Sequence, residues 1–93
     1  MTYEVVAITY DGKKLVRQTI PGATINAGSY ATFQALAPLN EVLEVIAVYA
    51  VAPSPGALSM VQNVTVSTNS VAFTVYAGTT TTVSTFELVL LGV

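Results

Sequence analysis

Short runs of strand-forming residues, separated by turn-forming residues, constrain the fold of this chain more than any other feature. Val, Thr, Ala, Tyr and Ile dominate the runs at residues 3–10, 14–20, 30–36, 41–52, 64–66, 71–76 and 83–93. β-branched and aromatic residues of this kind favour strands. A sustained apolar stripe at i, i+3 and i+4, which would indicate a helix, does not occur in the sequence. We therefore expect an all-β protein.

Two of the turns predict hairpins. Asp11-Gly12 lies between two strand-like runs, where glycine tolerates the positive φ of a tight turn. Residues 67–70, Ser-Thr-Asn-Ser, separate a second pair of runs. Strict alternation in this second hairpin places Val64, Val66, Val71, Phe73 and Val75 on the inner face.

Strands that follow one another with turns roughly every 8–14 residues are typical of β-sandwiches. We predict an antiparallel β-sandwich of about seven strands, immunoglobulin-like or jelly-roll in type. A small barrel is the alternative. No linker and no convincing repeat divides the sequence, so we expect residues 1–93 to form a single domain.

Charge is distributed unevenly along the chain. Only 9% of the 93 residues are charged and 53% are hydrophobic, whereas about a quarter of an average domain is charged. Residues 45–86 contain no Asp, Glu, Lys or Arg. A domain this small buries only about 60–65% of the surface of its unfolded chain. The surplus apolar surface predicts contacts with other subunits, since charge is depleted at the centre of such contacts.

One run within this region, EVIAVYAVA at residues 44–52, is apolar on both faces if it forms a strand. Alternation places Ile46, Val48 and Ala50 on one face, with Glu44, and the following residues on the other: Val45, Ala47, Tyr49 and Val51. One face fills the sandwich and the other needs a cover, because an open apolar strand promotes aggregation. We predict that Val45, Ala47, Tyr49, Val51, Leu88 and Leu90 form an interface with another chain.

Several functional classes fit the sequence poorly. The net charge of −2 does not suit nucleic-acid binding, and no apolar run approaches the roughly 20 residues of a membrane helix. Without histidine or cysteine, the chain has neither the commonest general base nor a thiol nucleophile. We expect no enzyme, no cofactor and no metal site. The first residues, Met-Thr-Tyr-Glu, do not resemble a secretory signal, so we expect synthesis in the cytoplasm.

The pattern as a whole resembles the small β-sandwich minor virion proteins of tailed bacteriophages, of the capsid decoration or cement type. The similarity is carried by TINAGSYATFQA at residues 24–35 and by NSVAFTVYAGTTTTVSTFELVLLGV at residues 69–93. This resemblance implies a structural protein of the virion, synthesised in the host cytoplasm. It would bind the major capsid protein or other virion subunits on the outer shell as a trimer or dimer, and stabilise the contacts between capsomers.

Two alternatives remain open. The tyrosines and the threonine run at residues 79–82 suit a carbohydrate- or receptor-binding module such as the head of a fibre. A filament or tail subunit, completed by a strand donated from a neighbour, also fits the apolar strands.

Overall fold

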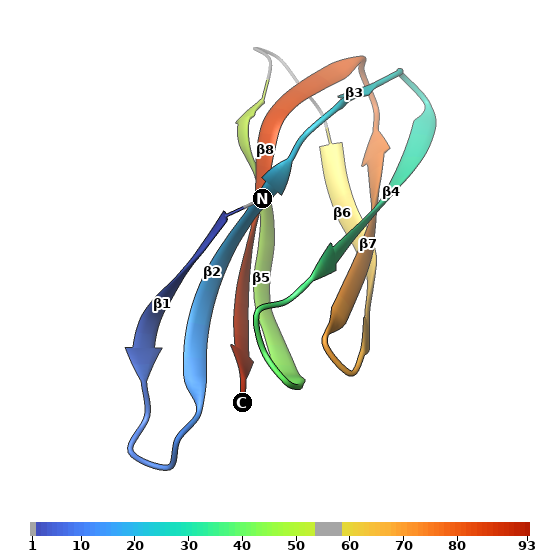
Figure 1. The fold of residues 1–93 in the computed structure, drawn as a ribbon. Coiled ribbons are helices and arrows are strands. Elements are labelled where there is room, and N and C mark those ends of the chain that lie inside the picture. Colours follow the sequence, from blue (N-terminus) through green and yellow to red (C-terminus); the bar gives the residue numbers. More distant parts are fainter. Residues whose placement is uncertain (1, 54–58) are drawn as a thin grey trace.

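The computed structural model describes residues 2–53 and 59–93, which form eight strands in two antiparallel sheets (Figure 1). The strands are β1 (Thr2–Ile8), β2 (Lys14–Pro21), β3 (Thr24–Ile25), β4 (Ser29–Leu36), β5 (Val42–Pro53), β6 (Ser59–Ser67), β7 (Ser70–Ala77) and β8 (Thr81–Gly92). The predicted antiparallel β-sandwich is confirmed. Seven of the strands correspond to the predicted runs, and the two-residue β3 is additional.

Strand β8 lies at the centre of the larger sheet. It pairs with β2 and β3 along one edge and with β5 along the other, and β1 lies outside β2. Leu88 and Leu90 point into the core and are fully buried, whereas Val89 and Leu91 are half-buried on the outer face. The last strand is therefore apolar on both faces, with one face in the core and the other on the outer surface of the sheet.

The smaller sheet has the order β4-β7-β6. Its central strand β7 alternates as predicted, with Val71, Phe73 and Val75 buried against the larger sheet. The core contains three phenylalanines, one on each of β4, β7 and β8. The ring of Phe86 lies 4.6 Å from that of Phe33 and 5.3 Å from that of Phe73, measured between centroids. These rings join the two sheets.

Both predicted hairpins are present. In the first, Gly12 has a φ of 87°, and the amide of Thr9 donates to the carbonyl of Lys13 at 2.8 Å. The Thr9 hydroxyl donates to Asp11 and, as the largest cause, lowers the pKa of this carboxyl. This hairpin, β1–β2, projects from the sandwich (Figure 1).

The predicted alternation is wrong in two strands, because bulges interrupt the pairing. In β5, register shifts leave Leu43 and Ile46 without a partner on β8. Val45 and Val48 consequently lie opposite Leu90 and Leu88 and pack against the core, as does Ala50. Ile46, expected beside Val48, is instead exposed.

In β6, the pairing with β7 shifts between Gln62 and Thr65, and Asn63 adopts a φ of 53°. Val64 lies in this irregularity and is exposed rather than inward. Val66 is opposite Val71 but remains more than a third exposed. An extra residue in one strand reverses the faces of the residues that follow it.

Over residues 2–53 and 59–93, we find no helix with the length and hydrophobicity needed to cross a membrane.

Candidate functional site

The outer face of the larger sheet carries an apolar surface built from three of its strands. Residues directly opposite each other in paired strands share a face. The register therefore places Leu15 beside Leu91, and Val89 beside Ala47, with Val51 further along β5. We call these five residues the outer apolar surface. They are all half-buried by their neighbours, and β2, β8 and β5 hold them in one layer.

Two polar pairs border the outer apolar surface. Arg17 on β2 donates to Glu4 on β1, and the Tyr49 hydroxyl on β5 donates to Glu87 on β8. The hydrogen bond with Glu4 raises the pKa of Arg17, and the one with Glu87 raises the pKa of Tyr49. The two pairs link neighbouring strands across the sheet, and each of the three charged groups, on Glu4, Arg17 and Glu87, has a hydrogen-bond partner.

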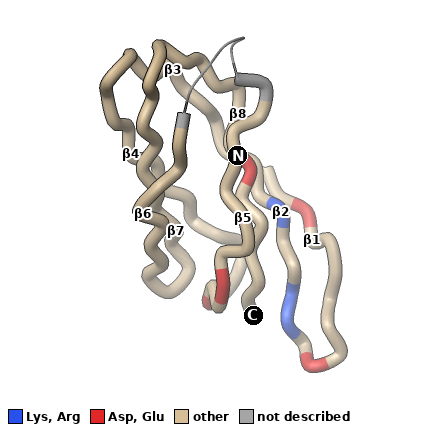
Figure 2. Tube along the Cα trace, turned by 180° about the vertical axis from the view of Figure 1, so that it is seen from behind, with Lys and Arg blue, Asp and Glu red and all other residues tan. Residues whose placement is uncertain are grey.

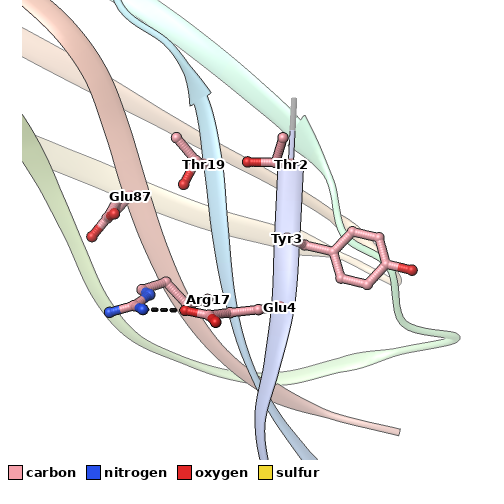
Figure 3. Close-up of a pocket in the computed structure, with 6 residues that line it drawn as sticks. All are labelled: Thr2, Tyr3, Glu4, Arg17, Thr19 and Glu87. Atoms are coloured by element: carbon pink, nitrogen blue, oxygen red, sulfur yellow. Dashed lines mark hydrogen bonds and ion pairs between the residues drawn. The ribbon is translucent and has the colours of Figure 1, made fainter.

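An open hollow of about 270 Å³ lies between these pairs, lined by Thr2, Tyr3, Glu4, Arg17, Thr19 and Glu87. Figure 3 shows Arg17, Glu87 and the two threonines around this hollow, whereas the ring of Tyr3 points away from it. The hollow therefore offers one guanidinium, two carboxylates and two hydroxyls, a set that suits hydrogen bonding to a polar ligand.

The outer face of the smaller sheet is different in character. Thr32 and Thr74 bring their hydroxyls within 3.4 Å, and Gln34 donates to Ser70 at 2.8 Å. Figure 2 shows no charged residue on β4, β6 or β7.

The same face also exposes Tyr30 and Met60, which lie on either side of Tyr76, and Leu36 at the end of β4. Both outer faces therefore carry apolar side chains, and only that of the larger sheet combines them with charged residues.

The predicted interface residues do not all lie on the outer apolar surface. Ala47, Tyr49 and Val51 are on the outer face of the larger sheet as predicted. Val45 faces the core, and Leu88 and Leu90 are fully buried in it, so these three are corrected to core residues. Because the core side of β8 is set by its packing against the smaller sheet, Val89 and Leu91 occupy the outer positions instead.

Strand β1 provides a further exposed apolar region that the sequence interpretation missed. All seven of its residues are exposed, among them Tyr3, Val5, Val6 and Ile8. Strand propensity alone does not show that a strand lies at the edge of a sheet. The sequence offered one indication of this. The strand is the first in the chain and the turn after it predicts pairing with β2, so no second neighbour was predicted for it.

Within residues 2–53 and 59–93, no group of three or more His, Cys, Asp or Glu side chains is arranged to hold a metal ion. Compared with models of protein families, with curated proteins and with solved structures, the chain matches none.

Proposed function

We propose that this protein is a structural virion protein of the capsid decoration type, which binds the outer shell as an oligomer and stabilises contacts between capsomers. The observation that carries the proposal is the outer apolar surface, which brings apolar residues of three neighbouring strands into one layer beside two charged or polar pairs. A flat apolar face bordered by a few charges is typical of protein–protein contacts.

The resemblance to phage decoration proteins supports a place in the virion, and the low charge of the chain supports a role in assembly. The shell is expected to contact Val89, Ala47 and Val51, with Tyr49 at the border. Tyrosine is enriched among residues that contribute most to binding, because it combines a large apolar ring with a hydroxyl.

The proposal is tested with particles of the virus that encodes the chain. Purified protein is mixed with shells stripped of minor proteins, and binding is measured by co-sedimentation and by copy number per particle. We expect saturation at a fixed ratio to the major capsid protein. Val89→Glu is expected to weaken binding about tenfold to a hundredfold, because it places a charge in the centre of the contact.

Thr65→Glu is the matched control, because Thr65 is exposed on the smaller sheet. It adds the same charge away from the proposed contact and is expected to leave binding unchanged. Equal binding by all three proteins would contradict the assignment of this face, and no binding by the parent chain would overturn the function.

A second function, recognition of a carbohydrate or receptor by a fibre head, is favoured by the polar hollow. Arg17, Glu87 and the two threonines offer donors and acceptors, and Tyr49 lies beside them. A glycan array is the direct test. Binding that is lost in Arg17→Ala but retained in Val89→Glu would favour this function over shell binding.

A further inference from the structure

The outward positions of the smaller sheet form one face without charged side chains. Strands β4, β7 and β6 contain no Asp, Glu, Lys or Arg, and Figure 2 shows none on them. The register fixes which side chains share this face, because they alternate with the residues that point into the core. We call them the uncharged face: Tyr30, Thr32, Gln34 and Leu36 on β4, Ser70, Ala72, Thr74 and Tyr76 on β7, and Met60, Gln62, Thr65 and Ser67 on β6.

Two tyrosine rings and a methionine lie side by side at one end of the uncharged face. Tyr30 and Met60 are both opposite Tyr76, one on each side of it. The ring centroids of Tyr30 and Tyr76 are 5.0 Å apart, and the ring planes are tilted by 44°. The exposed fractions are 65% for Tyr30 and 57% for Met60. This end of the face therefore offers aromatic and apolar area to a ligand, with a hydroxyl at the tip of each ring.

Hydroxyl and amide groups fill the centre of the uncharged face. Thr32, Thr74 and Gln62 lie opposite one another in the row next to the tyrosines. The following row holds Gln34 on β4 and Thr65 on β6. The hydroxyls of Thr32 and Thr74 are 3.4 Å apart, and this contact leaves acceptor sites on both, because a hydroxyl oxygen has two lone pairs. Each glutamine amide adds donors and an acceptor.

We infer that the uncharged face binds a neutral oligosaccharide, with one sugar against the tyrosines and further sugars along the threonine and glutamine rows. A sugar ring presents C–H groups on its faces, which pack against aromatic rings, and hydroxyls at its edge, which need hydrogen-bond partners. From Tyr30 to Leu36 the face extends about 20 Å along the strand. It therefore suits a linear chain of several sugars rather than a single one.

The lack of charge on this face selects the class of ligand. Acidic sugars and sulfate or phosphate esters are bound by Arg and Lys side chains. The three cations of the chain, Lys13, Lys14 and Arg17, belong to the β1–β2 hairpin of the other sheet. A charged glycan would therefore leave its anionic group without a counter-charge. A neutral glycan needs none, and the hydroxyls and amides of the face match its own hydroxyls.

The positions of the apolar residues favour a glycan over a second protein. Contacts between proteins have an apolar centre and a polar rim. Along β4 the order is reversed, because Tyr30 and Leu36 lie at the two ends and Thr32 and Gln34 lie between them. The centre is thus the polar part of the face. The inference goes beyond the proposed function, because the outer apolar surface belongs to the other sheet and lies on the opposite side of the sandwich.

A glycan array tests the class of ligand. The array carries neutral oligosaccharides of glucose, galactose, mannose and N-acetylglucosamine, from single sugars to hexamers, beside sialylated and sulfated glycans. We expect binding to at least one neutral series, with a signal that rises with chain length. The dissociation constant for the best neutral oligosaccharide is then measured by isothermal titration calorimetry. Binding to no neutral glycan, or to charged glycans alone, overturns the inference.

Variants of exposed residues test the place of binding. Tyr30→Ala removes the exposed ring and is expected to raise the dissociation constant about tenfold to a hundredfold, whereas Tyr30→Phe keeps the ring and is expected to raise it less than about threefold. Thr32→Glu places a carboxylate in the centre of the face and is expected to raise it about tenfold. Val89→Glu is the matched control, because it adds the same charge to the opposite side of the sandwich. Tyr30 and Thr32 are both exposed, so circular dichroism is expected to show folded proteins.

Equal affinity of the parent and Tyr30→Ala overturns the inference. Binding that is lost in Arg17→Ala and retained in Tyr30→Ala overturns it as well, because the glycan would then occupy the polar hollow. Self-association of the parent that Thr32→Glu abolishes and Val89→Glu does not would assign the face to a second copy instead. The shell-binding experiment remains separate. A protein that binds shells but no neutral glycan keeps the proposed function and overturns this inference, whereas one that binds neutral oligosaccharides through Tyr30 and ignores shells does the reverse.

Discussion

The hydroxyl of Tyr49 donates to the carboxylate of Glu87 on the outer face of the larger sheet. Neutral Tyr49 makes this hydrogen bond, whereas ionised Tyr49 would place a second negative charge beside Glu87. The pKa of Tyr49 is raised for this reason. Because the folded pKa lies above the unfolded one, the stabilising contribution is present below about pH 10 and is lost as the pH rises through the folded value.

We expect Glu87→Gln to lower the pKa of Tyr49 toward the ordinary tyrosine value of about 10, because the amide carries no charge. The ultraviolet absorbance of the phenolate reports the titration. Subtracting the titration of the matching Tyr49→Phe protein isolates Tyr49 from the other four tyrosines. An identical Tyr49 titration with Glu87 and with Gln at this position would show that the pair does not form in solution.

At the scale of elements, the passage from β2 to β3 depends on a close approach between two backbones. The amide of Gly22 donates to the carbonyl of Ser84 at 2.9 Å, and the amide of Val83 donates to that of Ala23 at 2.9 Å. A side chain on Gly22 would overlap the carbonyl group of Val83. Glycine is therefore required here by the proximity of β8, which no local signal in the sequence records.

Gly22→Ala is expected to destabilise the fold by about 3 kcal/mol, because the backbone of β8 must move to admit the methyl group. Gly12→Ala provides the comparison. Gly12 has open space around it but a φ of 87°, so we expect a loss of about 1 kcal/mol from backbone strain alone. Urea denaturation measures both. A loss at Gly22 no larger than the loss at Gly12 would contradict the close approach.

At the scale of the whole molecule, the chain presents apolar residues on two different sides of one sheet. The outer apolar surface faces away from the sandwich, and Tyr3, Val5 and Ile8 of β1 are exposed on the opposite, inner side of the sheet. The molecule measures 44 × 22 × 17 Å, an elongated shape to which the projecting hairpin contributes (Figure 1). The proposed shell contact would use only the outer side.

The proposed assembly into an oligomer makes thermal stability depend on concentration, since association stabilises only the folded chain. We expect the Tm of the parent chain to rise when the protein concentration is raised from micromolar to hundreds of micromolar. Differential scanning calorimetry at several concentrations measures this dependence, and a constant Tm for the parent would argue against association.

Much of the fold was predictable because strand and turn signals are local. Asp11-Gly12 indicated its hairpin correctly, since the turn depends on a glycine with positive φ and on the runs beside it. The alternation of Val71, Phe73 and Val75 was also correct, because β7 pairs with β4 without a shift and the extra residue in its pairing with β6 lies in β6. The candidate site was predicted only in part: Ala47, Tyr49 and Val51 lie on the outer face, and Val45, Leu88 and Leu90 do not.

The sequence by itself therefore determined that the chain folds into strands, where most of them begin and end, and that it has more apolar surface than a small core needs. Only the tertiary structure decided which side of each strand is inside. The bulges at Leu43 and Ile46 arise from pairing with β8, a strand nearly forty residues further along the chain, so alternation within β5 alone could not locate them. The exposure of β1 likewise follows from the unequal widths of the two sheets, a property of the assembled sandwich rather than of any single segment.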